Sequence, residues 1–380
     1  MRFVFFCHSL VSDWNNGNAH FFRGVCTELL RRGHELRIYE PNWAWSVLNL
    51  VRDYGTAPIR EFQERYPMLR SQGYSLNALD LERMLDGADI AVVHEWNDPA
   101  LVRRLGHYRQ THSHPRLLFH DTHHRSISRP HEVPSDALAH YDGILAFGER
   151  VREEYLRKGW ARQVWVWHEA ADTRVFTPRP ASAREGDVVW IGNWGDDERT
   201  AQIYEYLVEP VHELGLQARV YGVRYPADAL RRLSSAGIAY GGWLPNFRVP
   251  EVFGAFAVTV HIPRRFYSEV LHGIPTIRPF EALACGIPLI CAPWLDTENL
   301  FAAGADYLPV SNGAQMRKAL RAVLADTELA SELARHGRDT IMRRHTCVHR
   351  VDELLSIAQQ VGTAATTAGA ARTTAASSTR

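Results

Sequence analysis

Short apolar runs alternate with amphipathic segments along most of the chain. Segments such as residues 20–32 and 201–214 have apolar side chains three or four positions apart, which predicts helices. The apolar runs predict strands at residues 1–9, 35–39, 90–94, 116–119, 144–147 and 164–167, and again at 188–191, 218–221, 238–240, 258–262 and 288–293. Because strands followed by helices form parallel sheets covered on both faces, the pattern predicts two doubly wound, Rossmann-like α/β domains.

The pattern changes near the middle of the chain, where an extended, proline-terminated segment precedes the polar SAREGD. We expect an amino-terminal Rossmann-like domain over residues 1–168, an interdomain linker over 169–186, and a carboxy-terminal domain with closing helices over 187–361. Residues 362–380 are rich in alanine and threonine and predict a disordered tail. Ligands of such folds bind at the carboxyl ends of the strands, here in the cleft across which the two domains face each other.

The stretch HGIPTIRPFEALACGIPLICAP, residues 272–293, predicts a loop, a short helix and a buried strand. Pro275 and Pro279 delay a regular helix until about Phe280. The loop then presents backbone N–H groups at a helix N-terminus, where the helix dipole favours an anion. Arg278 adds a guanidinium suited to phosphate, and Glu281 a carboxylate that can accept two ribose hydroxyls. We interpret the stretch as a nucleotide-sugar pocket; the alternative is an ordinary loop–helix–strand.

Charge and cysteine content exclude several classes of function. Lys plus Arg and Asp plus Glu both total 43, so we expect neither a nucleic-acid partner nor a polybasic membrane anchor. The five cysteines form no CxxC pair, which is typical of reduced thiols in the cytoplasm. No apolar run reaches membrane length, although peripheral membrane contact stays open. The G-x-G-x-x-G fingerprint is absent after the first strand, so no NAD and no other cofactor is expected.

Several motifs resemble those of one family. RPFEALACGIPLI resembles the signature of GT-B glycosyltransferases of the group-1 type, particularly CgeB-like proteins. GNWGDDERT (192–200), GWLPNFRVPEVFGAF (242–256) and HTCVHRVDELL (345–355) are similar to further elements of that family, and the linker resembles its crossover. The resemblance implies the GT-B fold and transfer of a sugar from a nucleotide-diphosphate sugar, such as a UDP-sugar, to an acceptor.

The resemblance also implies which residues hold the donor. Glu281 would bind the ribose, Arg278 and the loop amides the diphosphate, and Arg199 and Arg264 further phosphate oxygens. The full set of expected donor contacts is Gly192, Asn193, Arg199, Arg264, His272, Gly273, Thr276, Ile277, Arg278 and Glu281. Gly273 departs from the family, since retaining enzymes often carry a second glutamate there, eight positions before Glu281.

Arginines and helix amides can stabilise the leaving diphosphate without a metal, and neither a D-x-D motif nor a metal-ligand spacing is present. An inverting route needs a base from the amino-terminal domain. His120 and Asp121, at a strand end, are the candidates, with His20 and Asp13 as alternates. The acceptor, whether glycan, lipid, protein or small molecule, is not identified by the sequence. A nucleotide-sugar 2-epimerase and a catalytically inactive nucleotide-sugar-binding protein remain alternatives.

Overall fold

The first half of the chain forms a seven-stranded parallel sheet in the order β3-β2-β1-β4-β5-β6-β7. The computed structural model describes residues 1–179, 183–195 and 198–377. The strands of this sheet are β1 (Arg2–Phe6), β2 (Glu35–Pro41), β3 (Ser71–Tyr74), β4 (Ile90–His94), β5 (Arg116–Asp121), β6 (Gly143–Ala146) and β7 (Val164–Val166). The central strand β4 is buried along its whole length, as its continuous apolar run predicts.

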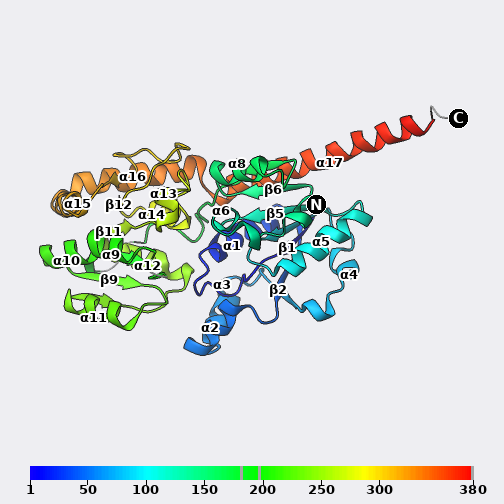
Figure 1. The fold of residues 1–380 in the computed structure, drawn as a ribbon. Helices are drawn as coiled ribbons and strands as arrows, with labels where there is room; N and C mark the ends of the chain where they lie inside the picture. Colours follow the sequence, from blue (N-terminus) through cyan, green and yellow to red (C-terminus); the bar gives the residue numbers. More distant parts are fainter. Residues whose placement is uncertain (180–182, 196–197, 378–380) are drawn as a thin grey trace.

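The second half forms a six-stranded parallel sheet in the order β10-β9-β8-β11-β12-β13. Its strands are β8 (Gly186–Ile191), β9 (Ala218–Tyr221), β10 (Ile238–Tyr240), β11 (Phe256–His261), β12 (Leu289–Cys291) and β13 (Leu308–Pro309). Each sheet has helices packed around it, and the two halves lie side by side (Figure 1). The predicted fold class, two doubly wound Rossmann-like units, is therefore confirmed.

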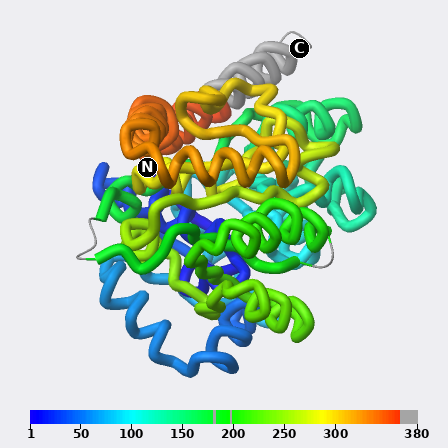
Figure 2. Tube along the Cα trace, turned by 90° about the vertical axis from the view of Figure 1, so that its left-hand side faces the viewer, coloured from blue at the N-terminus to red at the C-terminus, as the bar shows by residue number. Residues whose placement is uncertain are grey.

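Helices connect the strands in both halves. In the first half they are α1 (Asn18–Arg31), α2 (Trp45–Tyr54), α3 (Ala57–Arg65), α4 (Leu81–Leu85), α5 (Pro99–Thr111), α6 (Arg125–Ser128), α7 (Ser135–Leu138) and α8 (Glu149–Arg157), with the 3-10 turns η1 (Leu76–Ala78) and η2 (Pro130–Glu132). In the second half they are α9 (Thr200–Ile203), α10 (Glu209–Leu214), α11 (Ala227–Ser235), α12 (Val249–Gly254), α13 (Arg265–Glu269), α14 (Ile277–Cys285), α15 (Gly313–Ala325), α16 (Thr327–Arg344) and α17 (Cys347–Ser377), with the π-helical turn η3 (Tyr204–Val208) and the 3-10 turn η4 (Asn246–Arg248). In both views α2 lies at the lower edge of the molecule and the start of α17 at the upper edge (Figures 1 and 2).

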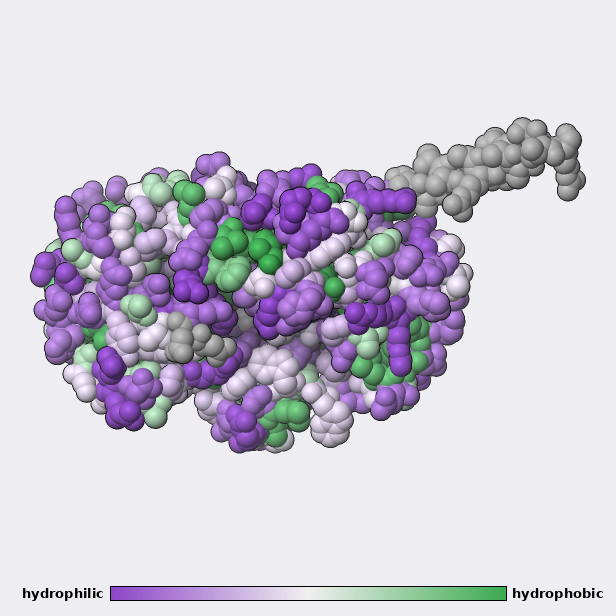
Figure 3. All heavy atoms as spheres, viewed as in Figure 1, coloured by the Kyte–Doolittle hydropathy of each residue, from purple (hydrophilic) through white to green (hydrophobic). Residues whose placement is uncertain are grey.

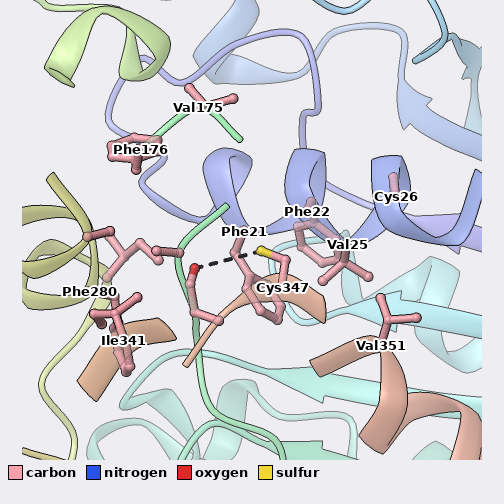
Figure 4. Close-up of a cluster of buried hydrophobic side chains, with 14 of the residues drawn as sticks. Phe21, Phe22, Val25, Cys26, Val175, Phe176, Phe280, Ile341, Cys347 and Val351 are labelled. Carbon is pink, nitrogen blue, oxygen red and sulfur yellow. Dashed lines mark hydrogen bonds between the residues drawn. The ribbon is translucent and has the colours of Figure 1, made fainter. Parts of the chain in front are cut away.

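The closing helix α17 packs against α1 of the first half, so it joins the two halves. Figure 4 shows the apolar cluster at this junction, with Phe21 of α1, Phe176 of the connecting segment, Phe280 of α14 and Cys347 of α17. Close packing here needs a residue without a side chain. A Cβ on Gly24 of α1 would lie 2.4 Å from the Cys347 sulfur.

The start of α14 differs from the sequence-based expectation. The helix begins at Ile277, not near Phe280. Pro279 is tolerated because it occupies the first turn, where backbone N–H groups have no partner inside the helix. The helix ends at Cys285, and Gly286 follows in the left-handed conformation, with φ of 67°, as predicted.

The closing helix α17 spans Cys347–Ser377, and the disordered tail over residues 362–380 stays a prediction. Residues 180–182 of the predicted linker, residues 196–197 and residues 378–380 of the predicted tail lie outside the described part of the chain. No helix of the described ranges is long and apolar enough to cross a membrane.

Candidate active site in the interdomain cleft

A cleft of about 430 Å³ lies between the two halves and is lined by residues of both. Figure 3 shows this face of the molecule hollowed near its middle. In the first half the lining residues follow the carboxyl ends of strands, such as His8 after β1 and Trp96 after β4. In the second half Gly192 and Asn193 follow β8, and Arg264 follows β11. The cleft thus occupies the position in which doubly wound folds bind their ligands.

Four arginines of the second half, Arg199, Arg224, Arg264 and Arg278, line the cleft. The guanidinium of Arg199 donates to the backbone carbonyls of Asn193, Trp194 and Ile262, the last at 2.9 Å. Burial and the neighbouring positive charge of Arg264 lower the pKa of Arg199 to about 9. Arginines held close together in this way repel one another, and a bound anion relieves that repulsion.

The N-terminus of α14 lies beside these arginines. Thr276, Ile277 and Arg278 line the cleft, and Thr276 precedes the helix with a left-handed φ of 59°. The helix has nine residues, and its dipole adds partial positive charge at this end. The structure therefore places Gly192, Asn193, Arg199, Arg264, Thr276, Ile277 and Arg278, all predicted donor contacts, on one wall of the cleft.

His272 and Gly273, two further predicted donor contacts, do not line the cleft. A Cβ on Gly273 would lie 2.6 Å from Thr297 Oγ1 and 2.8 Å from Glu298 Oε1, and the left-handed φ of 89° strains any other residue, so a glutamate is disfavoured at this position. Glu298 Oε1 instead accepts the Glu149 N–H at 2.9 Å. The departure from the family pattern therefore has a physical cause, since the carboxylate of Glu298 fills the space beside Gly273.

Glu281 is fully buried and also lies away from the cleft surface. One carboxylate oxygen lies 2.8 Å from His20 Nδ1, and the other pairs with Arg278. His20 Nε2 accepts the N–H of Asp172 at 3.0 Å, so Nδ1 carries the proton and donates it to Glu281. Glu281 thus connects α14 with α1 and the connecting segment, and it does not line the cleft.

The predicted bases His120 and Asp121 lie inside the first half. His120 is fully buried beside Phe22 and Trp167, and neither ring nitrogen has a hydrogen-bond partner among the described residues. Burial lowers the pKa of His120 to about 3. Asp121 accepts from the Tyr155 hydroxyl at 2.8 Å, and burial raises its pKa. Neither residue reaches the cleft, because β5 includes both and the chain turns into the cleft only after them.

The two alternative candidates for the base also have partners. His20 contacts Glu281 and Asp172, as described above. Asp13 lines the cleft, but its carboxylate accepts several hydrogen bonds. Its oxygens accept from Trp243 Nε1 at 3.0 Å, from Arg23 Nη1 at 2.8 Å and from the Asn246 N–H at 3.0 Å. Asp13 therefore ties the first half to the second.

Three cleft residues were missed by sequence reasoning, namely His8, Trp96 and Glu169, and Trp45 and His123 line the cleft as well. The position of His8 just after the first strand was the only signal for it. Glu169 is only 7% exposed, and burial together with the charge of Glu281 raises its pKa to about 8, against the lowering effect of Arg278. Glu169 thus brings a protonated carboxyl group into the cleft at neutral pH.

Within residues 1–179, 183–195 and 198–377, no group of three or more His, Cys, Asp or Glu side chains is arranged to hold a metal ion.

Comparison with known proteins places these features in a family context. Residues 199–356 match the family model described as glycosyl transferase-like. The comparison with curated protein sequences gave no match. The predicted class of enzyme, a glycosyltransferase, is confirmed at this level, whereas the finer resemblance to CgeB-like proteins stays a prediction.

Solved structures share the fold over nearly the whole chain. Sucrose-phosphate synthase from Thermosynechococcus elongatus is 13% identical, with a TM-score of 0.64 over 96% of this chain and all of that one. HepE from Anabaena, in complex with UDP and glucose, is 12% identical, with a TM-score of 0.65 over 95% and 100%. BGT of T4 phage, in complex with UDP and Mn²⁺, is 11% identical, with a TM-score of 0.61 over 95% and 99%. These likenesses show that the chain has the GT-B fold.

Proposed function

We propose that the protein transfers a sugar from a UDP-sugar to an acceptor bound in the same cleft. The observation that carries the proposal is the wall formed by Arg199, Arg264 and Arg278 at the N-terminus of α14. Such a wall suits a diphosphate, which carries negative charge on several oxygens. The UDP bound to HepE and to BGT, two proteins of the same fold, favours uracil as the base.

We propose that each of the two sheets, with its helices, binds one of the two substrates. Residues 1–168 receive the acceptor, residues 187–361 bind the donor, and residues 169–186 join them. Gly192, Asn193 and residues 276–278 contact the nucleotide diphosphate beside the arginines. Glu281 acts indirectly, since its ion pair orients Arg278. His120, Asp121, His272 and Gly273 lie behind the residues that line the cleft and help to hold them in place.

In the proposed reaction the bond between the anomeric carbon and the diphosphate breaks, and a bond to the acceptor oxygen forms. The hydroxyl proton leaves the acceptor, and the electron pair of the broken bond stays on UDP. The three arginines stabilise that developing charge by preorganised electrostatics, so we propose that a metal ion is not required. The free, buried cysteines fit a reaction in the cytoplasm.

The test is an assay of UDP release from radiolabelled UDP-glucose, UDP-galactose and UDP-N-acetylglucosamine, with a mixed acceptor extract and with or without EDTA. We expect labelled product from one donor, unaffected by EDTA and lost in Arg199→Ala. Arg335→Ala, on the exposed side of α16 and paired with Asp339, is the matched control. An isomeric donor formed without acceptor would instead indicate an epimerase. A folded wild-type protein that releases no UDP from any donor would contradict the proposal.

A further inference from the structure

An aromatic surface lies on the first-half side of the cleft, away from any sequence motif. We call His8, Trp45 and Trp96, which all line the cleft, the aromatic wall. The His8 ring centroid lies 5.1 Å from that of Trp45 and 6.4 Å from that of Trp96, and the two indoles are 6.3 Å apart. The three rings come from the end of β1, the start of α2 and the end of β4, so the fold assembles them from distant segments.

Three residues that line the same cleft carry buried polar atoms without partners among the described residues. His8 Nε2, Asn18 Oδ1 and His123 Nδ1 are buried, make no hydrogen bond with the described part of the chain, and belong to residues that line the cleft. The Asn18 amide nitrogen is already used, since it donates to Thr122 Oγ1 at 2.5 Å. Buried polar atoms are normally satisfied, so unpaired ones in a cleft point to a ligand. An amide oxygen accepts hydrogen bonds, and a neutral imidazole has one accepting nitrogen.

The histidines of this region are uncharged at neutral pH. Burial and the positive charge of Arg125 lower the pKa of His8 to about 4. Burial, with the neighbouring His124 and Arg125, lowers the pKa of His123 to about 2. Arg125 itself stacks on Trp96 at 4.0 Å and pairs with Glu95. The aromatic rings and neutral imidazoles of the wall suit a neutral ligand that has an apolar face and several hydroxyl groups.

We propose that the aromatic wall is the acceptor subsite and that the acceptor is an uncharged carbohydrate. Its sugar ring stacks on Trp45 and Trp96, and its hydroxyls form hydrogen bonds with His8, Asn18 and His123. A phenol would stack equally well, but it has one hydroxyl for three unpaired polar atoms. This inference rests on the proposed function, because it names the substrate of the same cleft.

The test is saturation-transfer NMR on the full chain with UDP, using the methyl glycosides of glucose, galactose, mannose and N-acetylglucosamine, and 4-nitrophenol as the aromatic alternative. We expect one glycoside to bind, with affinity at least tenfold lower in Trp45→Ala and Trp96→Ala. Trp43→Ala is the matched control, because Trp43 is 78% exposed and does not line the cleft. Trp45→Phe keeps an aromatic face and is expected to retain part of the affinity, which separates stacking from misfolding.

The UDP signal in the same samples distinguishes a failure of the acceptor inference from a failure of the proposed function. UDP binding without binding of any glycoside would overturn the acceptor inference alone, as would binding of 4-nitrophenol in place of the sugars. Equal glycoside affinity in wild type and in all the tryptophan variants would also overturn it. A folded protein that binds no UDP would overturn the proposed function and, with it, the assignment of this wall to an acceptor.

Discussion

Replacing Glu169 by glutamine is expected to change how stability depends on pH. The carboxyl group is buried and makes no hydrogen bond or ion pair with the described residues, and its pKa is raised by burial and Glu281 from an ordinary 4.5 to about 8. Between these two pH values the folded protein retains a proton that the unfolded chain has lost. The contribution of Glu169 to stability is therefore complete below pH 4.5 and is lost as the pH rises through 8.

The size of the effect follows from this difference in bound protons. One proton changes the free energy of unfolding by about 1.4 kcal/mol per pH unit. Between pH 5 and pH 7 the wild type should therefore lose about 3 kcal/mol relative to Glu169→Gln, because glutamine does not titrate. Any cost of burying the unpaired amide is the same at each pH and does not alter the slope.

The assay is urea unfolding of wild type, Glu169→Gln and Glu64→Gln at pH 5, 6 and 7. Glu64 is exposed on α3 and serves as the matched control, whose stability should run parallel to that of the wild type. If the free energy of unfolding of Glu169→Gln changes with pH as that of the wild type does, the folded protein holds Glu169 ionised. The reasoning from its burial and from the charge of Glu281 would then be refuted.

Two further predictions concern the contacts between the halves. His20→Ala removes a hydrogen bond to the buried Glu281 carboxylate, and we expect a loss of about 3 kcal/mol in urea unfolding; a loss below 0.5 kcal/mol would contradict the buried hydrogen bond. Gly24→Ala forces a Cβ to 2.4 Å from Cys347, so we expect its melting temperature to fall by several degrees. Gly362→Ala, with open space around its Cβ, should not fall, and equal behaviour of the two glycine variants would argue against the α1–α17 packing.

The fold was predictable because its central strands are buried on both faces, and such strands appear as continuous apolar runs. The strand β3 was not predicted. Its sequence, SQGY, is mostly polar, and it lies at the edge of the sheet, where only one neighbour is available.

The position of Arg264 in the cleft was predictable because topology places residues after parallel strands at one edge of the sheet. Arg278 lines the cleft for another reason, since it lies at the N-terminus of α14. His120 does not line the cleft, because a residue at the last positions of a strand still packs within the sheet and only the following residues turn outward. The partner of Glu281, His20, is 261 positions away, and no local pattern reveals such a pair.

The most direct test of the central claim is calorimetric titration with UDP, with GDP and dTDP for comparison. We predict saturable binding of UDP to the wild type, at least tenfold weaker binding to Arg264→Ala, and unchanged binding to Arg335→Ala. A folded wild-type protein that binds none of the three nucleotides, or an Arg264→Ala variant that binds UDP as well as the wild type does, would contradict a diphosphate site at the arginine wall.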